Sequence, residues 1–233
     1  MDAYFNGVRK RIPDGFEEWL DPRVSVAVSI DMHRGHLEDS PDCPCPAPRA
    51  RVIVEPINAF HRRCRALGVP IVHVKTVLRA SGVDDTKGYR AAWRLTFPVT
   101  VGAIPGAEGH ALEGTRWTEF VTEVAPADLV VETKKRLSVF YPTDLDFLLR
   151  NMRARTVVLT GGFTDCCVLN AAFDASNHDY RVVVCRDLVR GTNEPLEDAS
   201  LKIVSLHLGL VVDSAALLAE WEPRRPARAG AAP

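Results

Sequence analysis

The sequence predicts an α/β fold in which one parallel β-sheet is covered by helices on both faces. Six short apolar runs recur along the chain, and helical patterns separate most of them. Strands that alternate with helices are typical of parallel sheets, because each parallel connection needs a crossover segment. The chain has 233 residues, of which 46% are hydrophobic, and this is enough for one domain with a full core.

The composition excludes several classes of partner. The net charge is -1, so we expect neither nucleic acid nor an anionic membrane surface as a partner. No apolar stretch approaches the ~20 residues of a membrane span, and the first residues lack the apolar segment of a signal peptide. The six cysteines are too sparse for a disulfide scaffold and suit a reducing compartment, so we expect a cytoplasmic protein.

The first third of the chain predicts an arm, two strands and a helix. Residues 1–23 mix charges, aromatics and prolines, and we interpret them as an N-terminal arm that packs on the domain or on a partner subunit. Strands are expected over 24–30 and 70–76, with an amphipathic helix over 49–67 between them. The first strand ends at Asp31, which is either a turn residue or a carboxylate at the edge where α/β sheets place ligands.

The loop after the first strand holds His33, His36, Cys43 and Cys45. Such a set of side chains can bind zinc, but the spacing fits no standard zinc finger. Prolines beside the cysteines favour a plain loop. We therefore assign no metal ligand in the sequence.

Residues 78–105 have poor periodicity and carry several arginines and aromatics. A long irregular segment after a strand often forms the wall or the lid of a pocket. The alternative is a solvated insertion that Trp93 anchors on the domain.

The second half of the chain continues the alternation. A short helix is expected over 119–124, and a strand over 129–132 runs into Lys134, which is either a surface charge or a catalytic cation. The remaining strands are expected at 156–159, 181–185 and 209–212, and the remaining helices at 145–151, 169–177, 195–207 and 214–221. The domain then spans 24–222, and residues 223–233 are expected to form a disordered tail rich in Pro, Arg, Ala and Gly.

The stretch 160–168, which reads TGGFTDCCV, lies at the turn between a predicted strand and a predicted helix. Strand, glycine turn and helix form the arrangement that presents a nucleophile at the carboxyl edge of a parallel sheet. A cysteine at a helix N-terminus lies near unpaired N–H groups and the positive end of the helix dipole, which lower its pKa. The same N–H groups can bind the oxyanion that forms when a carbonyl is attacked.

Three motifs resemble the isochorismatase-like cysteine hydrolases. The first is the apolar strand that ends in Asp31. The second is the segment 134–140, KKRLSVF, which is similar to the family's K-x-R-x-S-x-F. The third is the segment 160–168, which is similar to T-G-x-x-T-D-x-C-V and whose spacing assigns the nucleophile to Cys167. The resemblance covers roughly residues 24–217.

The resemblance implies a three-layer α/β/α sandwich around a six-stranded parallel sheet. It implies a catalytic triad of Asp31, Lys134 and Cys167 that needs no cofactor. It also implies a cis peptide bond between Gly162 and Phe163, with the backbone N–H groups of Phe163 and Cys167 as the oxyanion hole. A homodimer or homotetramer is implied as well.

The reaction that the resemblance implies is hydrolysis of the C–N bond of a small amide or carbamoyl compound, with release of ammonia through a thioester. Asp31 would take the thiol proton, Lys134 would favour the thiolate, and Cys167 would attack the carbonyl carbon. A metal-assisted hydrolase of the nicotinamidase type is one alternative. A non-catalytic member of the family that binds a small molecule is the other.

We expect the substrate to carry a carboxylate, because arginines and aromatics follow several of the predicted strands. A guanidinium is the usual partner of a carboxylate, since its fork makes two parallel hydrogen bonds. The candidate substrate-binding residues are Arg79, Arg90, Trp93, Phe140 and Arg190. The alternative is that these arginines are solvated or join subunits.

Overall fold

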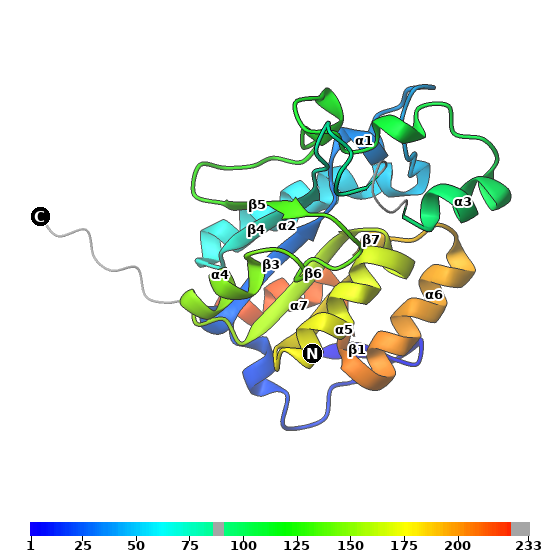
Figure 1. Ribbon diagram of the computed structural model, residues 1–233. Coiled ribbons are helices and arrows are strands. Elements are labelled where there is room, and N and C mark those ends of the chain that lie inside the picture. Colours follow the sequence, from blue (N-terminus) through cyan, green and yellow to red (C-terminus); the bar gives the residue numbers. More distant parts are fainter. Residues whose placement is uncertain (86–90, 225–233) are drawn as a thin grey trace, which may run out of the picture.

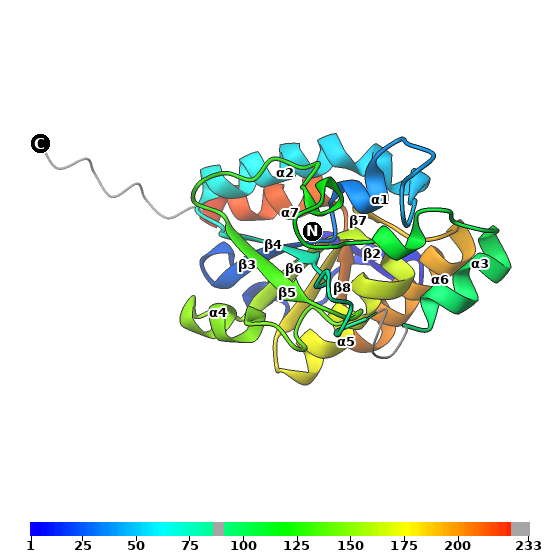
Figure 2. The same ribbon diagram turned by 45° about the horizontal axis from the view of Figure 1, so that its top comes forward.

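The computed structural model describes residues 1–85 and 91–224, which form one mixed sheet between two layers of helices (Figure 1). The sheet has eight strands in the order β2-β1-β8-β7-β6-β3-β4-β5. Figure 2 shows α2 (Val54–Leu67) and α7 (Ser214–Trp221) on one side of the sheet, and α4 (Leu145–Asn151) and α5 (Leu169–Asn177) on the other. The predicted α/β class with helices on both faces is therefore confirmed.

Six parallel strands make up most of the sheet. Each forms where an apolar run of the sequence is predicted to be a strand, and the pairs between neighbours are all parallel. The strands are β3 (Ser25–Ile30), β4 (Ile71–Thr76), β5 (Leu129–Lys134), β6 (Thr156–Gly162), β7 (Arg181–Arg190) and β8 (Gly209–Val212). All residues of β3, β4 and β6 are buried, as expected for central strands covered on both faces.

The prediction of six strands is wrong, because the N-terminal arm adds two more. Strands β1 (Asp2–Phe5) and β2 (Val8–Arg11) form an antiparallel hairpin, and β1 pairs with β8 through Tyr4. Asn6 and Gly7 turn the chain with φ of 51° and 79°, the left-handed values that two-residue hairpin turns require. The hairpin strands have four residues each, and β2 carries three basic residues, so they lack the apolar run on which the strand count rests.

The helices follow the predicted pattern with three differences, the first being the short helix α1 (Arg34–Leu37) in the segment interpreted as a plain loop. Helix α6 (Glu194–Ile203) forms as expected, and a 3-10 helix over Pro48–Ile53 precedes α2. The helix predicted over 119–124 is absent, because Phe120 pairs with His33 in an isolated β-bridge instead. Helix α3 (Trp93–Val101) forms inside the segment predicted to be irregular, although Pro98 lies within it.

Two hydrophobic clusters hold the helices on the sheet. One joins α4 and α5 to the strands through side chains such as Leu145, Leu149 and Ala172. The other joins α2 and α7 to the opposite face, with Phe60 and Trp221 fully buried or nearly so. In the described residues, no helix is both long and apolar enough to cross a membrane.

Strands β3 and β6 approach each other closely at their carboxyl ends. Gly161 has a φ of +106°, and a Cβ atom there would overlap the carbonyl oxygen of Ile30 and lie 2.8 Å from the Ile30 nitrogen. A glycine is needed at this position for both reasons. The contact fixes the point from which the chain leaves β6 next to the end of β3.

We predict that Gly161→Ala destabilises the protein far more than Gly102→Ala. Gly102 also has a left-handed φ of +90°, but nothing lies within 4 Å of a Cβ atom there. The control therefore carries only the backbone strain of about 1–2 kcal/mol, whereas Gly161→Ala adds an overlap costing at least about 2 kcal/mol more. Urea unfolding measures both variants, and equal losses would contradict the account of this contact.

Candidate active site

Three side chains from three different strands meet at the carboxyl edge of the sheet. Asp31 follows β3, Lys134 ends β5, and Cys167 lies just after β6. The Lys134 Nζ lies 2.6 Å from Asp31 Oδ2 and 3.5 Å from Cys167 Sγ. One ammonium group therefore contacts both a carboxylate and a thiol.

The carboxylate of Asp31 is held from several sides. Its backbone has a φ of 52°, and its N–H donates to the carbonyl of Val74 in the neighbouring strand. The N–H and the hydroxyl of Thr76 lie 3.0 and 3.2 Å from Oδ1, so Oδ2 is left to accept from Lys134. A left-handed aspartate is uncommon, and such backbones cluster at functional sites.

The charges of Asp31 and Lys134 stabilise each other inside the protein. Burial alone would raise the pKa of Asp31, but Lys134 and the neighbouring histidines bring that pKa down to about 2. Burial alone would also lower the pKa of Lys134, and Asp31 and Cys167 raise it above its usual value. Both groups are therefore ionised at neutral pH, although their side chains are 1% and 2% exposed.

Cys167 lies in a π-helical turn, Thr164–Val168, that leads into α5. The backbone N–H groups of Cys166 and Val168 both donate to the carbonyl of Phe163, so the turn folds back on the end of β6. The Gly162–Phe163 peptide bond is cis. The Cys166 thiol, at 3.9 Å, and burial raise the pKa of Cys167, which Lys134 opposes. The resting sulfur is therefore a thiol beside an ammonium group.

Asp165 ties this turn to the loop after β7. Its Oδ1 accepts a hydrogen bond of 2.7 Å from the N–H of Thr192. A Cβ atom on Gly191 would lie 2.6 Å from the same oxygen, so this approach needs a glycine. Asp165 therefore positions the turn that carries the two cysteines.

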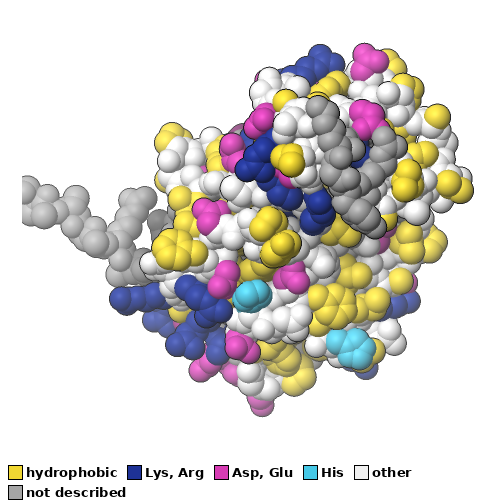
Figure 3. Space-filling view, in the orientation of Figure 1, with side chains coloured by type: hydrophobic (Ala, Val, Ile, Leu, Met, Phe, Trp, Pro, Cys, Tyr) yellow, Lys and Arg dark blue, Asp and Glu magenta, His cyan; other side chains and the backbone are white. Residues whose placement is uncertain are grey.

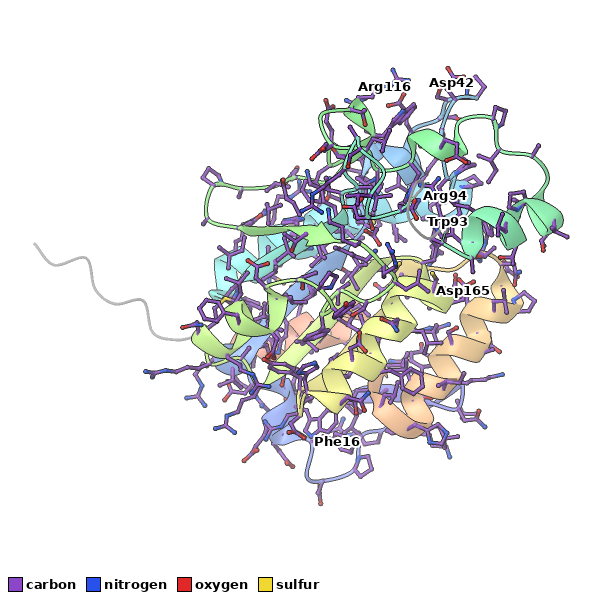
Figure 4. All side chains as sticks on the ribbon, viewed as in Figure 1. Phe16, Asp42, Trp93, Arg94, Arg116 and Asp165 are labelled. Carbon is purple, nitrogen blue, oxygen red and sulfur yellow. The ribbon has the colours of Figure 1, made fainter. Side chains whose placement is uncertain are left out.

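A cavity of about 580 Å³ opens above the three side chains. Its wall is largely apolar and aromatic and includes Leu78, Trp93, Phe97 and Phe163. Figure 4 shows Trp93 at the start of α3 and Asp165 just before α5, and both side chains line this cavity. A space of this size can hold a small organic molecule.

Of the candidate substrate-binding residues that the structure describes, only Trp93 lines the cavity. Arg79 does not line the cavity and forms a salt bridge of 2.9 Å with Asp84. Arg190 donates to the carbonyl of Val189 at 2.6 Å, and Phe140 is buried in the core, where it stacks on His178. Arg90 lies outside the described residues.

Other residues line the cavity without having been expected there. Lys135 and Arg136 follow Lys134 directly, and Figure 3 shows Lys and Arg side chains gathered near the end of β5. Asn170 also lines the cavity, and its buried Oδ1 has no hydrogen-bond partner among the described groups. Thr76 lines the cavity as well, and its place at the end of the second predicted strand is a signal that could have indicated it. No local signal distinguishes Asn170 from the other residues of α5.

The loop after β3 does not bring its two histidines and two cysteines together. His33 and His36 cluster with His110, which comes from a distant part of the chain. The Cys43 thiol donates to the carbonyl of Gly35 at 3.4 Å, and burial raises the pKa of Cys45 to about 12. The four-residue zinc set considered from the sequence is therefore not what the fold assembles.

Comparisons with known proteins agree with this architecture. The Isochorismatase domain model matches residues 25–216. Maleamate amidohydrolase of Pseudomonas putida is 29% identical over 191 residues, which are 82% of this chain and 83% of that protein. Ureidoacrylate amidohydrolase RutB of Methylobacterium radiotolerans is 35% identical over 209 residues, 84% of this chain and 79% of that protein.

A solved structure shares the fold. The cysteine hydrolase from Pseudomonas syringae pv. phaseolicola 1448A superposes with a TM-score of 0.75 at 20% identity. The match covers 87% of this chain and 94% of that one. At this level of identity, the likeness shows the fold alone.

We predict that Lys134→Met destabilises the protein by about 3–5 kcal/mol, because it leaves the buried carboxylate of Asp31 without its cation. The matched control is Lys135→Met, one residue along, which should cost no more than ~1 kcal/mol because its ion pair with Asp84 is partly solvated. Urea unfolding of both variants gives the comparison.

Adding Asp31→Asn to Lys134→Met should recover part of the loss, since no buried charge then remains. Equal losses of stability in Lys134→Met and Lys135→Met, or a further loss when Asp31→Asn is added, would contradict this prediction. The ion pair between Asp31 and Lys134 would then not be what stabilises the carboxyl edge of the sheet.

Proposed function

Since this chain belongs to the isochorismatase family, we propose that it is a cysteine-dependent amidohydrolase acting on a small amide or carbamoyl compound. The observation that carries the proposal is the Lys134 ammonium held between the Asp31 carboxylate and the Cys167 thiol at the base of a cavity. Two relatives named above are amidohydrolases, which supports C–N hydrolysis here. A non-catalytic binding protein has no need of these three groups in contact.

In the first half of the proposed reaction, Cys167 attacks the carbonyl carbon while Asp31 takes the thiol proton. At rest the proton stays on sulfur, because the pKa of Cys167 is raised and that of Asp31 is about 2. Proton transfer therefore has to accompany attack, when negative charge moves from sulfur to the carbonyl oxygen. Lys134 stabilises the sulfur charge on the way.

The tetrahedral intermediate needs donors for its oxyanion. We assign this role to the backbone N–H groups of Phe163, which lies just before the turn, and of Cys167, which lies within it. One such donor contributes about 3–4 kcal/mol in other hydrolases. Asp31 then gives its proton to the departing ammonia or amine, and a thioester remains on Cys167.

Water completes the cycle. Asp31, ionised again, takes a proton from a water molecule that attacks the thioester. The C–S bond then breaks, Asp31 returns the proton to the Cys167 sulfur, and the carbonyl product leaves as its acid. The net change is one amide and one water converted into one acid and one ammonia. No step in this sequence requires a cofactor.

The cavity wall supports a substrate that carries a carboxylate. Arg136 lines the cavity, whereas Arg190 does not. The Nη1 of Arg136 donates to the backbone carbonyls of Asp84 and Lys135, each at 2.7 Å, and within the described residues Arg136 forms no ion pair with a carboxylate. Lys135, in contrast, lies 3.3 Å from the carboxylate of Asp84. A guanidinium beside apolar side chains suits a small acid with a short carbon chain. This assigns to Arg136 the role that the sequence suggested for Arg79 and Arg190, while the same role for Arg90 stays a prediction. The cytoplasmic location and the homodimeric or homotetrameric state stay predictions.

We predict that Cys167→Ala abolishes ammonia release, while Cys166→Ala keeps most of it. Only Cys167 has its sulfur beside the Lys134 ammonium at 3.5 Å among the contacts of the described residues. The assay is ammonia release from a panel of amides, ureido acids and N-carbamoyl compounds. A dead Cys166→Ala variant with an active Cys167→Ala variant would falsify the assignment, and a panel without any substrate would favour a binding protein.

We also predict that Arg136→Ala lowers kcat/KM for a ureido acid at least ~10-fold and leaves the corresponding uncharged amide within about 3-fold, because one charge-assisted hydrogen bond contributes ~1.5–3 kcal/mol. Arg79→Ala is the control, since its guanidinium is paired with Asp84 outside the cavity. Steady-state kinetics on the substrate pair measure both. If Arg136→Ala affects the two substrates equally, no carboxylate binds there.

A further inference from the structure

Three buried histidines meet beside the triad. His33 and His36 come from the segment after β3, and His110 comes from the segment between α3 and β5. Their exposed fractions are 0%, 7% and 6%, and one ring nitrogen of each lies within 4.8 Å of the others. The ring centroids are 4.5 to 5.9 Å apart. The fold therefore brings His110 beside two imidazoles that lie three residues apart in the sequence.

Hydrogen bonds fix the orientation of two of the rings. The Nδ1 of His33 lies 2.9 Å from the carbonyl oxygen of Trp117, and the Nδ1 of His36 lies 2.9 Å from that of Cys45. A carbonyl oxygen only accepts, so each Nδ1 carries the proton and donates. Each neutral ring then presents the bare lone pair of its Nε2, the nitrogen that commonly binds metals.

The unprotonated Nε2 atoms of His33 and His36 have too few hydrogen-bond donors around them among the described groups. The Nε2 of His33 is buried and has no hydrogen-bond partner among the described groups. The Nε2 atoms of His36 and His110 are 3.4 Å apart, and a proton on His110 can satisfy His36 alone. The Nδ1 of His110 is then buried without a partner as well. Within the described part of the chain, protein groups alone leave this cluster unsatisfied, which native interiors usually avoid.

The chain around the cluster is shaped to hold the rings. Gly35 lies against His33 and Trp117, and a Cβ atom there would be 3.0 Å from both the His33 Nδ1 and the Trp117 carbonyl. A backbone carbonyl that accepts from the outer nitrogen of a histidine is the usual support of a metal ligand, since it sets the tautomer and the ring orientation. Both features resemble a built site more than a chance contact.

We propose that His33, His36 and His110 bind a divalent transition metal ion, with Zn²⁺ as the best match. Three imidazole nitrogens with a fourth position left open form the donor set of catalytic zinc sites. His36 and His110 line the same cavity as Asp31 and Cys167, so the fourth position faces that cavity. The ligand set excludes Cys43 and Cys45, and it joins the loop after β3 to the segment before β5.

The fourth ligand would be water or a polar atom of the substrate. This part of the inference rests on the proposed function, because it takes the cavity to be the substrate site. The Nε2 of His33 lies 3.9 Å from Asp31 Oδ1, so a bound ion would sit within reach of a substrate held at the triad. Binding of the ion itself does not depend on what reaction Cys167 performs.

The test uses the full-length protein, stripped with a chelator and then titrated with Zn²⁺ and, separately, with Co²⁺. We expect one ion per chain by elemental analysis after gel filtration, a visible cobalt spectrum typical of four-coordinate nitrogen and oxygen ligands, and a higher Tm with Zn²⁺ than without. A stripped wild-type protein that takes up no ion, or whose cobalt spectrum is that of the hydrated ion, would overturn the proposal.

Variants locate the site. His110→Gln and His36→Gln should each bind Zn²⁺ at least ~100-fold more weakly and lose the Tm increase, since each removes one of three ligands. His61→Gln is the control, because His61 is also fully buried with unpartnered ring nitrogens among the described groups but lies in a different cluster, against His73. Undiminished binding in His110→Gln would place the ion elsewhere and contradict the proposal.

The two proposals fail in different ways. Ammonia release by a protein that binds no ion would refute the metal-site proposal and leave the proposed hydrolase function unaffected. A protein that binds one ion per chain, loses this ion in His110→Gln and shows no amidase activity would refute the hydrolase proposal and support the metal site.

Discussion

The ion pair between Asp31 and Lys134 is the interaction on which the rest of this site depends. Both side chains are almost fully buried, and either charge alone would be very costly in the interior. They come from strands β3 and β5, which do not touch, and β4 lies between them. Thr76 at the end of β4 bridges the gap, because its hydroxyl donates to Asp31 and accepts from Lys134. One small network of charges therefore depends on the alignment of three strands.

The thiol of Cys167 is brought to this pair by β6, the strand on the other side of β3. Gly161 lets β6 approach β3 at its carboxyl end, and the turn that follows places Cys167 next to the Lys134 ammonium. Asp165 holds the same turn against the loop after β7. Four neighbouring strands, β6, β3, β4 and β5, therefore each contribute one group, and the sheet makes their separation rigid. Groups held at fixed separations can act together on a bound molecule, so the contact between Lys134 and Cys167 can serve catalysis as well as stability.

Much of this arrangement can be predicted from the sequence, because it depends on local patterns. Apolar runs predict the six parallel strands, and ligands bind at the carboxyl edge of such sheets, which is where Asp31, Lys134 and Cys167 each follow a strand. The N-terminal hairpin is not predicted although Asn6-Gly7 is a strong turn signal, because its strands have only four residues each and β2 is mostly basic. Helix α3 is not predicted because Pro98 and its mixed composition hide the period.

What could not be predicted depends on tertiary contacts. His110 joins His33 and His36 only because the segment before β5 folds back over the loop after β3, and no local period marks such a return. Arginine side chains are long, so their place in the sequence did not show that Arg79 turns to Asp84 while Arg136 reaches the cavity. Sequence patterns predict which strand a residue follows far better than where a flexible side chain ends.

The central claim is that Cys167 forms an acyl-enzyme intermediate, and partitioning with hydroxylamine tests it most directly. Two substrates with the same acyl group and different leaving amines are hydrolysed in the presence of hydroxylamine, and the ratio of hydroxamate to acid is measured for each. A shared thioester predicts the same ratio for both substrates, since the leaving amine has gone before the partition occurs. A ratio that changes with the leaving amine would contradict the account, because water would then attack the amide directly.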